Sequence, residues 1–203
     1  MKFLGMISFA MAVYGRVCDI AVLADRSFAA ASGFTHNSAE LRDFIQTKVR
    51  EAAAPFNPPF GLTINIATIQ FVENPPVSTF DHYIDFQKVA RNTVLDPNRC
   101  FVIFFTGRDT VLDNGELRLG MSPIGKACNR FVVVAKYVDR TQIYKTLAHE
   151  MGHMFGAKHD IDTVCKAQTG FIMSGIQRLE FSGCSIGAIT TKLFSNKKFS
   201  KSL

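Results

Sequence analysis

Three histidines and one glutamate in a short stretch form the pattern in this sequence with the clearest chemical meaning. His149 and His153 are four residues apart, so on a helix both imidazoles lie on one face and can reach one metal ion. Glu150 stands beside the first histidine, where a general base can take a proton from a metal-bound water. Gly156 permits a left-handed turn that brings His159 back to the metal. Three imidazoles and one open position are the ligand set of a catalytic zinc site.

The length of the pattern separates it from a chance match. A bare His-Glu-x-x-His can occur in an unrelated helix. Here the pattern extends to HExxHxxGxxH, and an Ile-Met-Ser turn follows at residues 172–174. Met173 of this turn is expected to pack beneath the imidazoles as an apolar floor without binding the metal, a role close to that of an ordinary core methionine.

These motifs resemble those of the metzincin metalloproteases. Asp160, directly after the third histidine, resembles the adamalysin branch, also called reprolysins or ADAM-type proteases. Four other stretches are similar to strands or motifs of that branch: residues 19–25, 104–107, 120–128 and 181–185. The resemblance covers about residues 17–190 and implies a sheet-and-helix upper part, a small lower part and a cleft between them.

The site and the resemblance together predict a secreted zinc-dependent endopeptidase that acts on proteins or peptides. One zinc ion would polarise the scissile carbonyl and activate a water molecule, with Glu150 as the general base. The alternative is a secreted binding protein that keeps the scaffold but has lost catalysis. Loss of catalysis usually involves replacement of the base or of a metal ligand. Here Glu150 and all three histidines are present.

The resemblance also raises the question of calcium, because some adamalysins bind a structural calcium ion away from the catalytic site. Asp19 matches one carboxylate of that site. Cys100 stands where a second carboxylate would be, and Gly187 replaces a side-chain ligand. No calcium is therefore expected.

Length and charge limit the number of domains and the classes of partner that the chain can bind. A chain of 203 residues with 47% hydrophobic composition fits a single domain with one core. The net charge of +6 is spread along the chain, apart from a basic tail at residues 195–203 that is expected to be solvated. No helix-turn-helix, glycine-rich phosphate loop or aromatic-basic platform indicates nucleic-acid binding. We expect a monomer whose partners are protein or peptide substrates.

The N-terminus has the layout of a secretory signal peptide. Lys2 precedes an apolar run that ends in small residues, and cleavage after Ala12 or after Gly15 would fit. The run is too short to span a membrane as a mature helix, and no other run approaches that length. The alternative is a retained, buried N-terminal segment. We expect a signal peptide at residues 1–15, a catalytic domain at residues 16–203, and secretion.

Periodicity predicts an α/β fold in which strands alternate with helices. Strands are expected at residues 18–24, 62–72, 100–106, 117–124 and 131–137, and helices at 38–54, 80–95, 141–154 and 185–194. This order favours a five-stranded, mostly parallel, twisted sheet with one antiparallel edge strand. The zinc helix and a small irregular C-terminal subdomain follow the sheet.

The strand at residues 117–124 is expected at the sheet edge, because Pro123 cannot donate to a ladder. An extended substrate can bind such an edge as an added strand. A proline that only protects the edge against aggregation is compatible with this role. The candidate substrate-binding residues are Gly120, Met121, Ser122 and Ile124.

The five cysteines of a secreted chain should mostly be paired, with one left over. The resemblance implies a bridge between Cys128 and Cys184. Cys18 and Cys100 each lie six residues before the expected end of a strand, and parallel neighbours about 4.8 Å apart would bring them level. A Cys18–Cys100 bridge with Cys165 as the odd thiol is therefore expected. The alternative is that the two strand cysteines are core residues and that Cys165 pairs with one of them.

Overall fold

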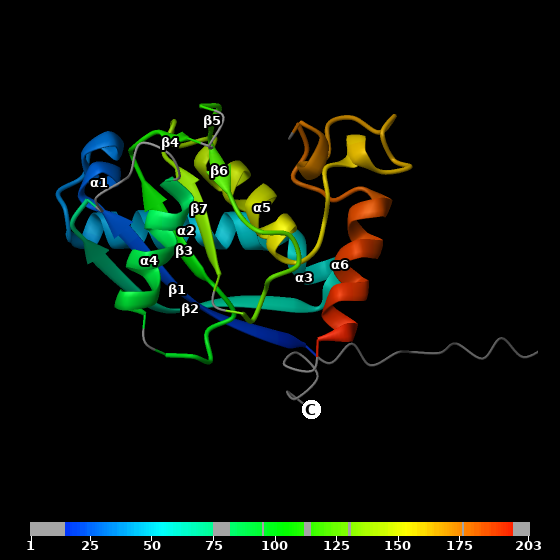
Figure 1. Ribbon diagram of the computed structural model, residues 1–203, viewed down its shortest axis with the longest axis horizontal. Coiled ribbons are helices and arrows are strands. Elements are labelled where there is room, and N and C mark those ends of the chain that lie inside the picture. The colour runs from blue at the N-terminus through cyan, green and yellow to red at the C-terminus, as the bar shows by residue number, and fades with distance from the viewer. Residues whose placement is uncertain are drawn as a thin grey trace, which may run out of the picture.

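The computed structural model describes residues 15–74, 82–94, 96–111, 115–129, 131–175 and 177–196. The predicted signal peptide, apart from residue 15, and most of the predicted basic tail lie outside the described residues. Figure 1 shows a sheet with helices packed on it, and an irregular segment, yellow to orange, at one end beside the last helix. Among the described residues, no helix is long and apolar enough to cross a membrane.

The central sheet has five strands in the order β2-β1-β3-β7-β6 (Figure 1). β1, β2, β3 and β7 pair in parallel, and β6 pairs antiparallel with β7 at the edge. The strands of this sheet are β1 (Arg16–Asp25), β2 (Leu62–Val72), β3 (Val102–Thr106), β6 (Gly120–Met121) and β7 (Val132–Lys136). The predicted α/β fold with an antiparallel edge strand is confirmed.

Helices cover both faces of this sheet. The long helices are α2 (Ala39–Ala53), α4 (His82–Thr93), α5 (Ile143–Met154) and α6 (Gly183–Ser195). The shorter ones are α1 (Arg26–Ser32), α3 (Asn57–Phe60) and the 3-10 turns η1 (Ala54–Phe56), η2 (Asp160–Asp162) and η3 (Ile172–Ser174). Helix α1 was not predicted, although Asp25 caps its start by accepting from the amide of Phe28, and Gly33 ends it in a left-handed conformation.

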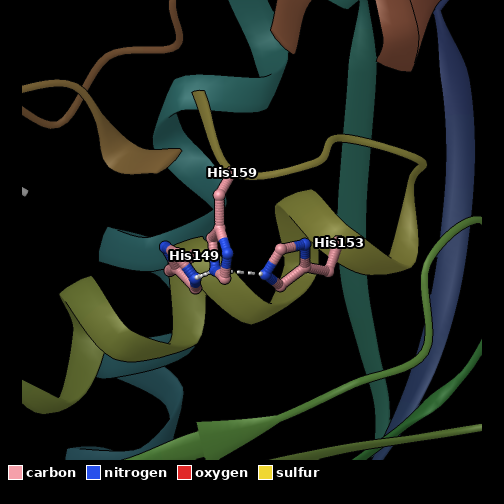
Figure 2. Close-up of side chains that lie close together, drawn as sticks. All are labelled: His149, His153 and His159. Carbon is pink, nitrogen blue, oxygen red and sulfur yellow. Dashed lines mark hydrogen bonds between the residues drawn. The ribbon is translucent and has the colours of Figure 1, made fainter. Parts of the chain in front are cut away.

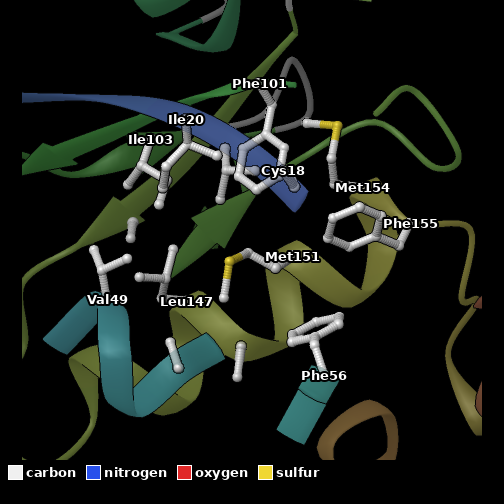
Figure 3. Close-up of a cluster of buried hydrophobic side chains, with 14 of the residues drawn as sticks. Cys18, Ile20, Val49, Phe56, Phe101, Ile103, Leu147, Met151, Met154 and Phe155 are labelled. Atoms are coloured by element: carbon white, nitrogen blue, oxygen red, sulfur yellow. The ribbon is translucent and has the colours of Figure 1, made fainter. Parts of the chain in front are cut away.

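The two faces of β1 show why the central strands are apolar throughout. Ile20 and Val22 belong to the core cluster that contains the buried residues of α2 and α5. Ala21 and Leu23 belong to the cluster that contains the buried residues of α4. Because successive side chains of a strand point to opposite faces, a strand covered on both sides needs apolar residues at every position. Figure 3 shows Leu147 and Met151 of α5 in the first cluster with Ile20 and Ile103.

The predicted strand at residues 117–124 forms two short strands. β5 (Leu117–Arg118) pairs with β4 (Thr110–Val111) in a separate two-stranded sheet, and β6 pairs with β7. Pro123 follows β6, which agrees with its inability to donate to a ladder. The chain therefore changes sheets within this segment, and only Gly120 and Met121 belong to the edge of the main sheet.

The disulfide predicted from the resemblance is wrong. Cys184, in the first turn of α6, is bonded to Cys165, with their Cα atoms 6.1 Å apart. Cys128 is buried and forms no disulfide, and its sulfur lies 3.6 Å from that of Cys100. The irregular segment after α5 passes beside α6 (Figure 1), so Cys165 reaches Cys184, whereas Cys128 is buried in the core.

The predicted Cys18–Cys100 bridge is also absent, since both cysteines are free buried thiols. The register of β1 and β3 also differs from the one assumed, although the two thiols are in hydrogen-bond contact. Ala24 is level with Phe105 and not with Thr106, so the assumed alignment was one residue out of step. The amide of Cys100 accordingly donates to the carbonyl of Asp19 and not to that of Cys18.

Peptide mapping without reduction tests this cysteine arrangement. We expect one fragment that links Cys165 to Cys184, which closes a loop of 19 residues and should stabilise the fold by about 3 kcal/mol. Cys18, Cys100 and Cys128 should react with a thiol reagent once the unreduced chain is unfolded. A fragment that links Cys184 to Cys128 would contradict the structure.

Candidate metal centre

Helix α5 places two of the three predicted metal ligands one turn apart. His149 and His153 lie on the same face of this helix, and their ring centroids are 4.7 Å apart. The helix ends at Met154 with Phe155 as its C-cap, and Gly156 follows with φ 109°. The amide of Ala157 donates to the carbonyl of Gly152, which closes the turn. The left-handed φ at Gly156 turns the chain back, as the glycine in the motif predicted.

The returning chain brings the third ligand into the same place. The Nε2 atom of His159 lies 3.2 Å from that of His149 and 3.1 Å from that of His153. Figure 2 shows the three rings converging, two from α5 and one from the segment after it. Tetrahedral zinc with Zn–N bonds of 2.0–2.1 Å needs nitrogen atoms about 3.3–3.4 Å apart. The three imidazoles therefore fit one metal ion of this size.

Backbone carbonyls determine which nitrogen of the two helical histidines faces the metal position. Nδ1 of His149 lies 2.8 Å from the carbonyl oxygen of Ile172, and Nδ1 of His153 lies 2.8 Å from that of Ala157. A carbonyl can only accept, so in the neutral ring each Nδ1 carries the proton and donates it. Each Nε2 is then left with a free lone pair directed at the other ligands.

The surroundings keep these imidazoles in the form that binds metal. Burial lowers the pKa of His149 below its ordinary value. Burial, with a smaller contribution from the neighbouring His149, lowers the pKa of His153 to about 4. Both rings are therefore neutral at neutral pH, and a neutral imidazole is the ligand form.

The predicted apolar floor lies directly under α5. Met173 belongs to η3 and is buried. A Cβ built on Gly152 would lie 2.8 Å from Sδ of Met173 and 3.0 Å from the ring of Phe181. Glycine at this helical position thus lets Met173 and Phe181 approach the backbone between the two histidines. The neighbouring Ile172 also supplies the carbonyl that orients His149.

The candidate base lies between α5 and the edge strand. Glu150 is buried, and its carboxylate Oε2 lies 2.9 Å from the hydroxyl of Ser122. A Cβ on Gly120 would lie 2.6 Å from Cγ of Glu150, so only glycine leaves room for the side chain. Burial raises the pKa of the Glu150 carboxyl to about 8, while the Ser122 hydroxyl and the charge of Arg118 act in the opposite direction. A dication beside it would favour the carboxylate further.

The four predicted substrate-binding residues have different surroundings. Gly120 and Met121 pair with Ala135 and Val134 of β7, and β6 is the last strand of its sheet among the described residues. The side chain of Met121 is buried in the α4 cluster. The amide of Lys136 donates to the carbonyl of Leu119, so by the antiparallel alternation the backbone groups of Gly120, not those of Met121, point to the open edge. The side chain of Ile124 is exposed. Ser122 turns its hydroxyl towards Glu150, which the sequence analysis did not predict.

Asp160 has a structural role that the sequence analysis missed. Its Oδ1 accepts hydrogen bonds from the hydroxyls of Ser182, at 2.5 Å, and Ser185, at 3.2 Å. Ser182 is also the N-cap of α6. These hydrogen bonds attach Asp160, the residue after the third ligand, to the start of α6. The Cys165–Cys184 disulfide links the same segment to α6 by a covalent bond. The similarity of residues 181–185 to a family motif was the signal that could have indicated this contact.

Comparison with known proteins gives one family match and several structural ones. Residues 14–183 match the sequence model described as metallo-peptidase family M12. Metalloproteinase-II from Bacteroides fragilis is similar with a TM-score of 0.62 and 17% identity, over 90% of this chain and 55% of that one. A structure described as a chaperone–substrate complex is similar with a TM-score of 0.62 and 14% identity, over 87% of this chain and 34% of that one. This chain thus spans about half of the first structure and a third of the second, and the likeness shows the fold.

Metal analysis of the purified protein tests the ligand set. We expect one metal ion per chain and, for His159→Ala, an affinity lower by at least about 100-fold, because loss of a direct ligand should exceed the 10–100-fold effect of an outer partner. His36→Ala is the matched control, since His36 packs on Phe71 and lies outside the triad. Equal metal content in the two variants would contradict the assignment.

Proposed function

Because the chain belongs to metallopeptidase family M12, we propose that it is a zinc-dependent endopeptidase that hydrolyses peptide bonds of proteins or peptides. The observation that supports this most directly is a buried carboxyl group, Glu150, next to a triad of neutral imidazoles. A binding protein that had lost catalysis would not need to keep Glu150 buried there.

The donor set supports zinc as the metal. Imidazole nitrogen is a preferred zinc ligand, and three histidines leave one position open, as in catalytic sites. When bound, zinc supplies Lewis-acid activation of the scissile carbonyl and of the attacking water. His149, His153 and His159 would hold the metal, and the carbonyls of Ile172 and Ala157 orient the first two rings.

Glu150 performs the proton transfers. Its side chain leaves α5 next to the first ligand and ends between the helix and β6. As a carboxylate it takes a proton from the attacking water, and as a carboxylic acid it returns the proton to the leaving amine. Both steps need the carboxylate held in one orientation near the metal position.

The substrate binds in extended form along the edge of the sheet. β6 has a strand partner only on its β7 side within the described part of the chain, so its other edge can pair with a peptide backbone. Gly120 contributes the backbone groups that point away from β7, whereas Ile124 offers an exposed apolar side chain. Pairing along this edge would carry the substrate past Glu150, which packs against Gly120.

We assign the chain to the adamalysin branch within this family. The two sequence features that carry the resemblance, Asp160 and residues 181–185, contact each other through Ser182 and Ser185. This contact supports the assignment, because both features then serve one purpose, the attachment of the third ligand's segment to α6.

We further propose secretion, a signal peptide at residues 1–15 and a single catalytic domain at residues 16–203. The Cys165–Cys184 disulfide supports an oxidising compartment. We also propose a monomer, because the triad and the base need no residue from a second copy.

Replacement of the base tests the proposed function. Glu150→Gln should lower peptide cleavage by about 10²–10⁴-fold while the metal stays bound, because the amide cannot accept the proton. The measurement is cleavage-site profiling on a peptide library, with and without a chelator, together with metal content. Glu51→Gln on α2 is the control, since Glu51 pairs with Lys48 away from the site. Full activity of Glu150→Gln would show that the mechanism is wrong.

The edge strand is tested by a bound inhibitor. A peptide-based inhibitor with a zinc-binding group should form main-chain hydrogen bonds with residues 120–124, because β6 is the open edge of its sheet. A crystal structure of the complex is the measurement. An inhibitor that binds the metal without any main-chain hydrogen bond to these residues would count against strand addition.

A further inference from the structure

Ser122 lies at the candidate base, although the sequence analysis assigned it to substrate binding. Its hydroxyl oxygen is 2.9 Å from Oε2 of Glu150 and 2.7 Å from the backbone carbonyl oxygen of Glu150. Within the described part of the chain, no other group forms a hydrogen bond with this carboxylate. Among the described residues, the Glu150 carboxyl group thus has a single hydrogen-bond partner, the Ser122 hydroxyl.

We propose that Ser122 is a positioning residue for Glu150: its hydroxyl fixes Oε2 and leaves Oε1 available for proton transfer. This inference rests on the proposed peptidase function. A carboxylate without such a partner can rotate about its side-chain torsions, and misplacement of a catalytic group by about 1 Å can cost 10²-fold in rate. A hydrogen bond to a charged acceptor is strong enough to select one orientation.

The chain on both sides of Ser122 fixes its position. Before it, Gly120 and Met121 pair with β7. After it, the amide of Gly125 donates to the carbonyl of His153 at 2.8 Å, and the amide of Ala127 donates to that of Met154 at 3.1 Å. The segment that carries Ser122 is thus attached to the sheet at one end and to the end of α5 at the other.

Close packing limits where the Glu150 side chain can go. A Cβ on Gly120 would lie 2.6 Å from Cγ and 2.8 Å from Oε1 of Glu150, and 2.9 Å from Cγ2 of Thr146. The backbone of the edge strand therefore lies against the aliphatic part of Glu150. This contact restricts the carboxyl group to a small region, and the Ser122 hydroxyl selects its orientation within that region.

A serine hydroxyl suits a partner that gains and loses a proton during catalysis. It carries one hydrogen atom and can also accept. While Glu150 is a carboxylate, the hydroxyl can donate to Oε2. When Oε1 of Glu150 holds the proton, Oε2 is still an acceptor, so the hydroxyl can keep donating to Oε2 or turn to the backbone carbonyl of Glu150. Only the O–H bond has to rotate.

The structure also contains a serine that serves as a matched control. Ser32 is buried on α1, and its hydroxyl donates to the carbonyl of Phe28 at 2.7 Å. Like Ser122, it forms a hydrogen bond with the backbone carbonyl of a helix. Unlike Ser122, it has no contact with Glu150, so Ser32→Ala reports the general cost of losing such a bond.

The experiment compares Ser122→Ala, Ser122→Thr and Ser32→Ala in the zinc-loaded full chain. Steady-state cleavage of a fluorogenic peptide, chosen from the library profile of the wild type, gives kcat and KM, and metal content and thermal unfolding are measured in parallel. Ser122→Ala should lower kcat by about tenfold or more with KM within about twofold, as expected for a lost hydrogen bond to a charged group. Ser122→Thr, which keeps the hydroxyl, should recover most of that loss, and Ser32→Ala should keep the wild-type kcat.

A crystal structure of Ser122→Ala supplies a readout that needs no turnover, and it should show Glu150 in a changed or a second rotamer. The assignment is overturned by an unchanged single rotamer, by a wild-type kcat in Ser122→Ala, or by a Ser122→Thr protein as slow as Ser122→Ala. A zinc-loaded wild type that cleaves no peptide would instead overturn the proposed function, and the assignment with it. The two failures are distinct, because only the second affects the unsubstituted protein.

Discussion

The site depends on two hydrogen bonds, from the imidazoles of His149 and His153 to backbone carbonyls. These bonds decide which ring nitrogen is free, and thus whether three lone pairs can meet at one point. Their acceptors, Ile172 and Ala157, lie on segments that follow the metal-binding helix, so the site forms only when the chain after the helix has folded back. The left-handed turn at Gly156 and the close packing at Gly152 make this return possible.

The rest of the molecule keeps that arrangement rigid. α5 packs with α2 against one face of the sheet, while α4 covers the other face. The irregular segment has little regular structure of its own, and it is attached to α6 through Asp160 and through the Cys165–Cys184 bridge. The third ligand, although it lies outside a helix, is therefore held by the core, by a buried carboxylate and by a covalent bond.

The sequence was most informative where chemistry depends on local spacing. The helical pair, the glycine turn and the third histidine lie within eleven residues, so their geometry follows from helix periodicity and one left-handed turn. Cysteine pairing depends instead on contacts between distant segments: Cys184 is bonded to Cys165, while Cys18 and Cys100 lie in contact without a bridge. The contact of Ser122 with Glu150 could not be predicted for the same reason, since it joins a strand end to a helix 28 residues later.

X-ray absorption at the zinc edge tests the central claim most directly, because it reports the atoms bound to the metal in solution. The structure predicts three imidazole nitrogens and one oxygen, with Zn–N distances of about 2.0–2.1 Å. The main competing donors in the described part of the chain are the buried thiols of Cys18, Cys100 and Cys128. A sulfur shell at about 2.3 Å, or fewer than three imidazoles, would contradict a catalytic site built from His149, His153 and His159.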